Sequence, residues 1–252
     1  MKKLREKPYP SVSETTKAEH VGMVKEIFGT ITERYDFLNH FLSLRRDISW
    51  RRFAVRRMRF FKTNRFLDVA CGTGDLAIDA VSRHSQIKAT GLDFVKAMTD
   101  RARIKLEKGR IGNRIRLVRG DATFLPFADD SFDVAGIAFG IRNIPDRMEA
   151  LREMTRVVAP GGQVLVLEMT LPRRRIFHGL SLFYLERILP RLARIFTGNP
   201  QAYIYLTDSI RHFPGPEQFS ALMEEAGLTE VKKYALTFGI TYLFSGTKMT
   251  AP

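Results

Sequence analysis

Short apolar runs alternate with amphipathic stretches through the central part of the 252-residue chain. The runs are short enough for buried strands, and the stretches between them place apolar residues at the spacing of a helix face. Strands that alternate with helices in this way indicate βαβ units, a parallel sheet and an α/β fold. The pattern predicts strands at 66–69, 87–92, 115–118, 132–139 and 163–167, and helices from Leu76, at 97–106 and at 148–158.

Acidic residues stand where several of these strands end. Asp93 ends the second predicted strand, Asp121 follows the third and Glu168 follows the fifth. Asp68 lies near the end of the first strand, just before a loop of small residues. Because open α/β sheets bind ligands at the carboxyl ends of their strands, these acids predict a ligand site at that edge.

The N-terminal region has a different pattern. Residues 1 to about 20 are polar and predict a loose arm. Apolar residues then recur at helical spacing from Val24 to Tyr35, and a second helical stretch has Trp50 on one side and arginines mostly on the other. We expect residues 1–60 to form an arm and a helical cap with a cationic outer face. The arginines of that face are Arg51, Arg52, Arg56, Arg57 and Arg59.

The remainder of the chain continues the α/β pattern and adds an insertion. We expect residues 61–252 to form the main unit, with an inserted amphipathic helical segment at about 173–212, and the chain to be one structural domain. The helix of this insertion must break or kink at Pro190. Two β-rich runs at 231–237 and 240–247 predict a closing antiparallel hairpin at the edge of the sheet.

Charge and composition narrow the class of protein. The net charge of +14 attracts polyanions such as nucleic acid, an anionic lipid surface or acidic substrates. The apolar runs are too short or too interrupted by arginine to span a bilayer, and the basic N-terminus has no apolar segment of a secretory signal, which predicts a cytoplasmic chain. A single cysteine, Cys71, excludes an internal disulfide and a cysteine zinc site, and we expect no metal.

The loop after the first predicted strand carries the sharpest chemical signal. Gly72, Gly74 and Ala77 match the dinucleotide-binding spacing G-x-G-x-x-A, and Asp93 follows where a ribose-binding acid is expected. The spacing permits NAD. Asp75, however, stands where the helix start would receive a pyrophosphate, and a carboxylate there repels phosphate.

A ligand with adenine and ribose but no phosphate avoids this conflict. S-adenosylmethionine carries a sulfonium and an ammonium group, which Asp68 and Asp75 would favour. Asp93 would accept hydrogen bonds from both ribose hydroxyls, and Asp121 with the Ala122 N–H would bind the adenine. The alternative is purely structural, with Asp75 as a helix cap, Asp93 solvated and the glycines in an ordinary turn.

Several motifs together resemble known methyltransferases. DVACGTGD, GLDF, GDATFLPFADDSFD and RVVAPGGQVLVLE are similar to class I S-adenosylmethionine-dependent methyltransferases. Three further segments resemble the menaquinone and ubiquinone biosynthesis C-methyltransferases, of the demethylmenaquinone methyltransferase type, and the match runs from about Val21 to Lys248. The segments are Tyr35–Arg52, Phe139–Asp146 and Tyr205–Gly215.

The resemblance implies a Rossmann-like seven-stranded sheet of order 3-2-1-4-5-7-6 with strand seven antiparallel. It implies S-adenosylmethionine as cofactor and S-adenosylhomocysteine as product. The cofactor-binding residues it indicates are Asp68, Gly72, Thr73, Gly74, Asp93, Asp121 and Ala122.

The implied reaction is methyl transfer to a ring carbon of a quinol. The carbon is a poor nucleophile until a hydroxyl loses its proton, so the site must stabilise a phenolate and align the carbon. The resemblance places Arg142, Asn143 and Tyr35 beside the substrate. Arg142 is too basic to accept the proton. The alternatives are a salt bridge from Arg142 to Asp146 and a packing role for Tyr35 in the cap.

Two histidines are further candidates for the proton acceptor. His40 and His212 could act as bases, although a histidine without a visible partner is more often structural or solvated. The chain departs from the family at Asp47, where many members carry a histidine, and at Ala138, where some members use a serine. These departures leave the choice between a naphthoquinol and a benzoquinol open.

The expected acceptor is a polyprenyl quinol, most simply demethylmenaquinol. The alternatives are a benzoquinol ubiquinone precursor, another small aromatic or lipid acceptor and, ranked low, a nucleic-acid-binding protein, because aromatic residues are not interleaved with the basic runs. A prenylated acceptor predicts peripheral association with the inner face of the cytoplasmic membrane. We expect no nucleic acid partner, and a homodimer is compatible with the sequence. The residues expected at the lipid surface or the tail are Arg51, Arg52, Arg56, Arg57, Arg173, Arg174, Arg175, Phe177, Phe183, Leu185 and Phe196.

Overall fold

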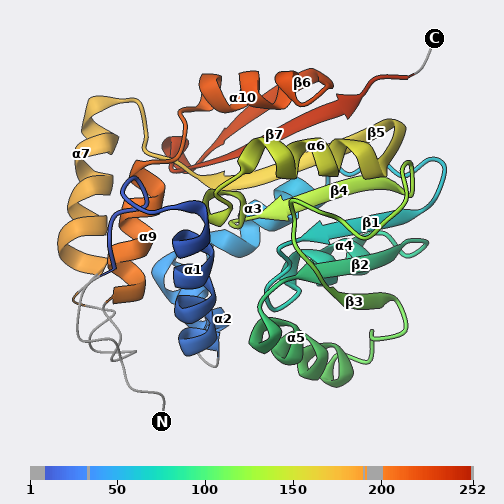
Figure 1. Ribbon diagram of the computed structural model, residues 1–252, viewed down its shortest axis with the longest axis horizontal. Helices are drawn as coiled ribbons and strands as arrows, with labels where there is room; N and C mark the ends of the chain where they lie inside the picture. The colour runs from blue at the N-terminus through green and yellow to red at the C-terminus, as the bar shows by residue number, and fades with distance from the viewer. Residues whose placement is uncertain (1–8, 33–34, 190, 192–200, 251–252) are drawn as a thin grey trace.

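A mixed sheet forms the centre of the computed structural model, which describes residues 9–32, 35–189, 191 and 201–250 (Figure 1). Among the described residues the sheet has seven strands in the order β3-β2-β1-β4-β5-β7-β6. β7 is antiparallel to both of its neighbours, and the other pairings are parallel. The predicted strand order and the antiparallel strand seven are confirmed. The strands are β1 (Arg65–Val69), β2 (Lys88–Asp93), β3 (Ile115–Arg119), β4 (Phe132–Ala138), β5 (Val158–Met169), β6 (Leu228–Leu236) and β7 (Thr241–Lys248).

Helices cover both faces of the sheet (Figure 1). Alternate strand residues point to opposite faces, so Phe66 of β1 packs with one helical layer and Leu67 with the other. Burial on both faces explains why the parallel strands read as nearly continuous apolar runs. One layer holds α3 (Arg46–Val55), α4 (Asp75–Arg83) and α5 (Lys96–Lys108), and the other holds α6 (Arg147–Val157) and α10 (Pro216–Glu225).

A third apolar cluster lies beyond the two sheet layers. Residues of α1 (Lys17–Ile31), such as Ile27, pack with Leu185 of η3 (Tyr184–Ile188) and Tyr203 of α9 (Gln201–Arg211). The N-terminal region and the predicted insertion thus pack together as one unit. Along the chain, α2 (Tyr35–Leu42) follows α1, and α7 (Arg175–Phe183) directly precedes η3. Pro190, Leu192, Arg194 and Phe196 of the expected insertion helix lie outside the described residues.

The expectation for the arginine-rich helix needs a correction. Trp50 and Ala54 of α3 pack in the same cluster as α4, so this helix belongs to a sheet layer. Arg51, predicted on a cationic outer face, is 7% exposed. Three carboxylates surround it, and their charge allows the guanidinium to be buried.

The C-terminal hairpin forms as predicted, with the three residues of η4 (Thr237–Gly239) between its strands. β7 inserts beside β5, and β6 takes the edge. Within the part of the chain described here, no helix is both long enough and apolar enough to cross a membrane.

Candidate functional site

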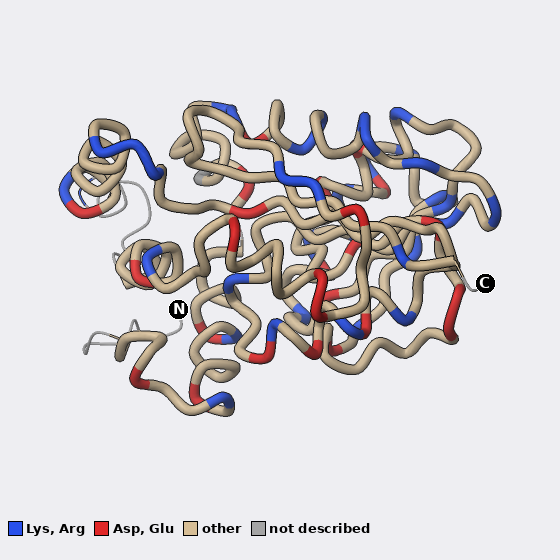
Figure 2. Tube along the Cα trace, turned by 90° about the horizontal axis from the view of Figure 1, so that it is seen from above, with Lys and Arg blue, Asp and Glu red and all other residues tan. Residues whose placement is uncertain are grey.

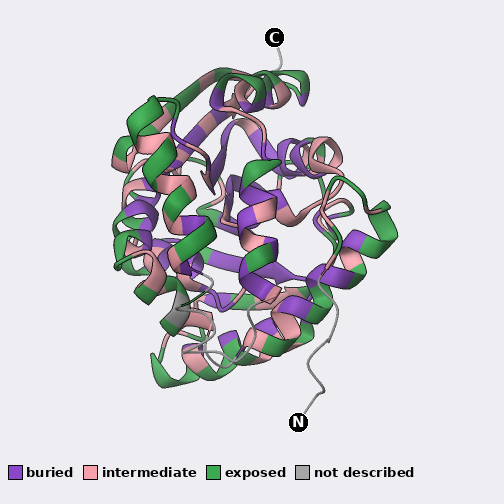
Figure 3. Cartoon of the chain, turned by 90° about the vertical axis from the view of Figure 1, so that its left-hand side faces the viewer, coloured by how far each residue is buried: buried purple, intermediate pink, exposed green. Residues whose placement is uncertain are grey.

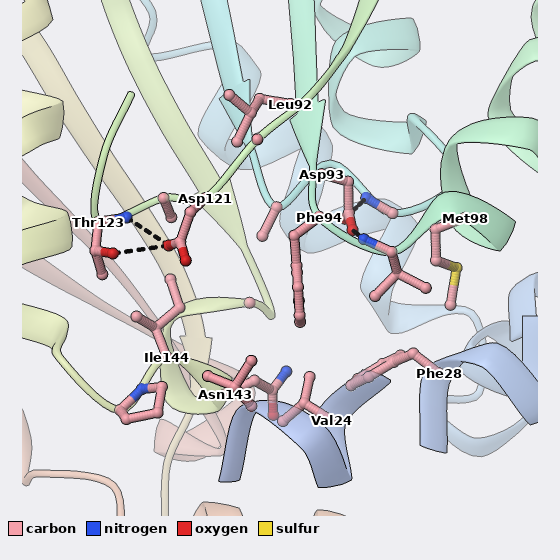
Figure 4. A pocket seen from close by; sticks show the side chains of 18 of the residues that line it. Val24, Phe28, Leu92, Asp93, Phe94, Met98, Asp121, Thr123, Asn143 and Ile144 are labelled. Carbon is pink, nitrogen blue, oxygen red and sulfur yellow. Dashed lines mark hydrogen bonds between the residues drawn. The ribbon is translucent and has the colours of Figure 1, made fainter. Parts of the chain in front are cut away.

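A cavity of about 310 Å³ lies at the carboxyl ends of β1 to β4, the edge that the acidic strand ends indicated. Small-molecule sites are concave and of about this size or larger. Residues after the strands form one wall, and Val24 and Phe28 of α1 form the facing wall (Figure 4). The described lining combines apolar side chains with a few polar groups. The cap helix therefore closes the cavity over the sheet edge.

The glycine loop joins β1 to α4 beside this cavity. Gly72 lines the cavity at φ +55°, and Gly74 precedes the helix at φ +84°. Both values lie in the left-handed region, where a side chain is strained. The loop can therefore present its backbone to a ligand without intervening side-chain atoms.

Asp93 lies at the end of β2 with its carboxylate held from behind. Its Oδ2 accepts a hydrogen bond from the Gly72 N–H at 2.8 Å, and its Oδ1 accepts one from the Val95 N–H at 2.8 Å. Burial raises the pKa of Asp93, and these backbone hydrogen bonds oppose that shift. A carboxylate has about four lone-pair sites, so each oxygen retains one for a ligand hydroxyl.

Asp121 and Ala122 line the same cavity. Asp121 lies on the other side of Phe94 from Asp93 (Figure 4). Asp121 Oδ1 accepts hydrogen bonds from the Thr123 N–H at 2.9 Å and from its hydroxyl at 2.8 Å. This turn fixes the second carboxylate. Gly72, Asp93, Asp121 and Ala122 are thus brought together as expected.

Three other expected cofactor residues do not line the cavity. Asp68 is buried behind the loop, where it accepts a hydrogen bond from the Ala77 N–H at 3.0 Å. The Thr73 hydroxyl donates to Asp36 Oδ1 at 2.5 Å, which fastens α2 to the loop. Gly74 forms the start of α4. In this structure Asp68, Thr73 and Gly74 support the glycine loop and do not face the cavity.

The electrostatic role predicted for Asp75 is wrong. Its carboxylate forms ion pairs with Lys105 and, at 3.3 Å, with Arg51, so its charge is compensated and cannot by itself repel a phosphate. Burial raises the pKa of Asp68 well above its ordinary value, although the Ala77 hydrogen bond opposes this shift. Neither acid is a free anionic group for a cationic ligand.

The cavity is nevertheless acidic. Its described lining includes the carboxylates of Asp93, Asp121, Asp146 and Glu149, while its one amine, Lys17, pairs with Asp146 at 2.6 Å. A pyrophosphate would find no unpaired cation among these residues, whereas a cationic ligand would be favoured. A cation with adenine and ribose therefore fits better than a dinucleotide. No described group of three His, Cys, Asp or Glu residues could hold a metal.

A second cavity, of about 120 Å³, adjoins the first. Apolar residues of α1, η3 and α9 form one part of its lining, and α2 and α3 contribute polar side chains such as Asn39, Asp47 and Arg51. Phe28, Tyr35 and Phe139 line both cavities and form the wall between them. Phe139 holds this place with φ +58°, a left-handed conformation that costs a non-glycine residue about 1 to 2 kcal/mol.

Arg142 lies behind the second cavity and is 6% exposed. Its Nη1 donates to Glu168 Oε1 at 2.5 Å and to the Phe139 carbonyl at 2.7 Å. The considered salt bridge to Asp146 does not form. Desolvation lowers the pKa of Arg142, but the charge of Glu168 opposes it and the pKa is raised overall, so the guanidinium stays charged. Its buried Nε has no partner among the described residues.

Asn143 and Tyr35 take part in the cavities as the resemblance implied. Asn143 lines the larger cavity, and Tyr35 lines both. Burial raises the pKa of Tyr35, with a hydrogen bond to Asn39 opposing the shift, which keeps the phenol neutral. Tyr35 is therefore suited to donating a hydrogen bond or packing against a ring, and not to accepting a proton.

The two candidate histidines lie outside both cavities. His40 Nδ1 contacts Asp47 Oδ2 at 2.7 Å, and His212 Nδ1 contacts the Asp208 carbonyl at 2.9 Å. Asp47, noted as a departure from the family, pairs with both His40 and the buried Arg51. A role as proton acceptor for a ligand in either cavity does not fit these positions.

Two other buried polar residues near the cavities were not predicted from the sequence. Tyr205 lines the second cavity and donates to Asn143 Oδ1 at 3.0 Å, and His20 Nε2 contacts its hydroxyl at 3.1 Å. Tyr205 begins one of the motifs that carried the resemblance, so a signal existed. His20 falls at the end of the stretch expected to be a loose arm, where nothing marked it.

Comparison with known proteins gives consistent results. Residues 13–248 match the model of the ubiE/COQ5 methyltransferase family. The chain is 42% identical over 226 residues to the ubiquinone/menaquinone biosynthesis C-methyltransferase UbiE of Geotalea daltonii, covering 89% of this chain and 96% of that protein. It is 41% identical to the demethylmenaquinone methyltransferase of Deinococcus radiodurans, covering 89% and 92%.

A solved structure shows the same fold. The structure is that of a SAM-dependent methyltransferase of Thermotoga maritima, described as a possible histamine N-methyltransferase. Its TM-score is 0.61 at 22% identity, over 88% of this chain and 99% of that one.

Replacing the buried Arg51 tests the charge network beneath the glycine loop. Arg51 contacts Asp47, Asp75 and Asp79 at 2.8, 3.3 and 3.2 Å. Arg51→Met should lower the free energy of unfolding at pH 7.5 by about 3 kcal/mol, because it leaves buried carboxylates without their cation. Urea unfolding measures this change.

The loss of unfolding free energy caused by Arg51→Met should be smaller at pH 5.5. Without the guanidinium, the folded-state pKa values of Asp47 and Asp79 rise, so folding takes up protons and the penalty is relieved as the pH falls. Arg52→Met, at the exposed neighbouring position, is the matched control and should change stability by less than about 0.5 kcal/mol. Equal effects of the two substitutions, or a deficit independent of pH, would contradict this account.

Proposed function

The chain belongs to the ubiE/COQ5 methyltransferase family, and from this premise we propose that it methylates a ring carbon of a polyprenyl quinol, with demethylmenaquinol as the preferred acceptor. The observation that carries the proposal is the pair of adjoining cavities, one acidic and one apolar, that meet at Phe28, Tyr35 and Phe139. Methyl transfer needs a donor and an acceptor held in contact. Two cavities with a common wall provide that arrangement.

The larger cavity suits S-adenosylmethionine, with S-adenosylhomocysteine as the product. Asp93 would accept hydrogen bonds from the ribose hydroxyls through the lone pairs that its backbone contacts leave free. Asp121 and the Ala122 N–H would bind the adenine, and Gly72 would let the ligand approach the backbone. Bound there, S-adenosylmethionine supplies an electrophilic methyl group whose sulfur takes the electron pair of the breaking C–S bond.

The acceptor ring would lie where the cavities meet, with its prenyl chain along the smaller one. The lining contributed by Leu185, Leu189 and Leu206 is apolar, which suits an isoprenoid chain. The ring carbon forms the new bond to the methyl group, and the proton on that carbon leaves. Ionisation of a ring hydroxyl makes the carbon nucleophilic.

Arg142, Asn143 and Tyr35 are the residues we assign to stabilising that ionised ring. The guanidinium of Arg142 stays charged and has an Nε–H without a partner among the described residues, so it favours a nearby oxyanion. Asn143 and Tyr35 would contact the ring oxygens. The proton itself would pass to water, because none of these three side chains is a base at neutral pH.

A benzoquinol is the second candidate acceptor. The printed name of the Geotalea daltonii relative includes ubiquinone as well as menaquinone, and the apolar lining does not distinguish a one-ring from a two-ring quinol. The same mechanism would apply to either acceptor.

We also infer that α7 docks on the inner face of the cytoplasmic membrane. Three of its apolar side chains, spaced for one helical face, are exposed by 76% at Ile176, 60% at Leu180 and 59% at Phe183. Arg174 and Arg175 begin this segment and would meet anionic head groups, each contributing about 1 kcal/mol, whereas Arg173 pairs with Glu217. Exposed positions recur on the helices of this side of the molecule (Figure 3).

The remaining positive charge is spread over many elements (Figure 2). Such a distribution does not form a single nucleic-acid-binding face, which supports the membrane in preference to DNA or RNA. The chain order also favours a membrane-facing α7, because η3 follows α7 directly and Leu185 of η3 lines the smaller cavity. A prenyl chain would thus enter near the lipid surface.

Titration with S-adenosylhomocysteine tests the donor site. The wild type should bind, and Asp93→Asn should raise the dissociation constant at least about tenfold, because a charged hydrogen bond contributes about 1.5 to 3 kcal/mol. Asp100→Asn, on the exposed side of α5, should bind normally. Thermal unfolding establishes that both variants are folded. Failure of the wild type to bind would refute the donor assignment.

The acceptor is identified by the product. Purified protein is incubated with methyl-labelled S-adenosylmethionine and either short-chain demethylmenaquinol or the matching benzoquinol, under reducing conditions. We expect the label on a ring carbon of menaquinol, located by mass spectrometry, with the larger kcat/KM for the naphthoquinol. A larger value for the benzoquinol would select the second candidate, and label in neither would refute quinol methylation.

Vesicle cosedimentation tests the membrane surface. Binding should require phosphatidylglycerol in phosphatidylcholine vesicles and fall with salt. Leu180→Glu should weaken it at least about tenfold, since it removes apolar burial and adds repulsion. Ile104→Glu, at a position 45% exposed on α5, is the control. If light scattering instead shows a homodimer that Leu180→Glu dissociates, the apolar face binds a second copy.

A further inference from the structure

Two buried polar side chains and one half-buried one, from separate parts of the chain, form a continuous hydrogen-bonded row. His20 belongs to α1, Tyr205 to α9, and Asn143 to η2 (Ile141–Asn143) at the end of β4. The His20 Nε2 to Tyr205 Oη distance is 3.1 Å, and the Tyr205 Oη to Asn143 Oδ1 distance is 3.0 Å. His20 and Tyr205 are 5% and 4% exposed. Buried polar groups held this way are costly unless each has its partner.

The single proton of the Tyr205 hydroxyl determines which group donates and which accepts in each hydrogen bond of the row. Tyr205 has a single hydroxyl proton, and it donates that proton to the Asn143 amide oxygen. The hydrogen bond between His20 and Tyr205 must then be donated by His20, so Nε2 carries a proton. Desolvation and Arg147 lower the pKa of His20 while Asp208 opposes them, which favours a neutral ring, and the hydrogen-bond geometry then places its single proton on Nε2.

The direction of the row decides which end of the Asn143 amide faces the cavity. With Oδ1 occupied by Tyr205, the NH₂ group is the end left to contact a ligand. Figure 4 shows the Asn143 nitrogen on the side of Phe94, inside the cavity, and the oxygen on the side of α1. An NH₂ group donates to an oxygen lone pair and offers nothing to a hydroxyl proton.

We propose that His20 and Tyr205 are positioning residues that lock the Asn143 amide with its NH₂ group toward the acceptor. This role rests on the proposed function, because it specifies the protonation state of the acceptor oxygen that Asn143 contacts. The site holds that oxygen as a lone-pair acceptor, which is the ionised ring oxygen or the carbonyl it becomes when the carbon is methylated. A neutral hydroxyl whose proton points at Asn143 is rejected.

The lock also explains why a donor histidine is buried in α1. Without His20, the Tyr205 hydroxyl loses the donor that holds it against the amide oxygen, so the lock is weakened. Without Tyr205, the amide is free to rotate and present its oxygen, which repels an oxyanion. Free rotation removes the stabilisation of the ionised ring without removing any atom that touches the acceptor.

Four substitutions test the lock. Tyr205→Phe should lower kcat for quinol methylation at least about tenfold, with KM for the quinol changed less and S-adenosylhomocysteine binding within about twofold of wild type. His20→Leu should lower kcat in the same direction. His20→Gln should restore kcat to within about threefold of wild type, because its amide N–H can donate in place of Nε2. Tyr234→Phe, which removes a hydroxyl from β6 outside both cavities, should behave as wild type.

The outcomes separate this inference from the proposed function. If wild-type protein methylates a quinol but Tyr205→Phe keeps its kcat, the lock is wrong and the function stands. If His20→Gln is as slow as His20→Leu, His20 does not act as a hydrogen-bond donor to Tyr205 and the lock is also wrong. If wild-type protein methylates neither quinol, the function fails first. Normal S-adenosylhomocysteine binding by each variant excludes misfolding as the cause of a low kcat.

Discussion

The buried cation of Arg51 is the interaction on which the rest of the site depends. A guanidinium in the interior is tolerated only with compensating charge, and here it draws together carboxylates from α3 and α4. Lys105 of α5 extends the network to Asp75 and, at 3.0 Å, to Asp36 of α2. Asp36 in turn receives the Thr73 hydroxyl of the glycine loop. One set of charges thereby fixes the loop, the layer below it and the cap above it.

The network leaves the cavity itself free for ligand chemistry. Because Asp75 and Asp68 are occupied in supporting the loop, the carboxylates that face the ligand are those at the ends of β2 and β3. Both are held by backbone groups or a neighbouring threonine. Two of the carboxylates that line the cavity are thus held in place before a ligand binds, which reduces the reorganisation that binding requires.

The sequence predicted the elements that depend on local pattern. Alternating apolar runs were enough for the parallel sheet, and the acids at strand ends were enough for the ligand edge, because both follow from periodicity and topology. The state of Asp75 was not predictable in the same way. Its partners, Arg51 and Lys105, come from helices distant in sequence, and only the packing of α3 under the loop brings them together. His20 was missed because a polar composition suggested an arm where a capped helix forms.

Phe139 has a consequence for the fidelity of the reaction. Its backbone is held in a left-handed conformation at the junction of the two cavities, where glycine would be relaxed. A glycine, however, would leave no ring beside the point where donor and acceptor must touch. The strained main chain thus keeps an aromatic side chain at this junction, where it fills space that water would otherwise occupy. Exclusion of water there favours transfer of the methyl group to the acceptor over its transfer to water.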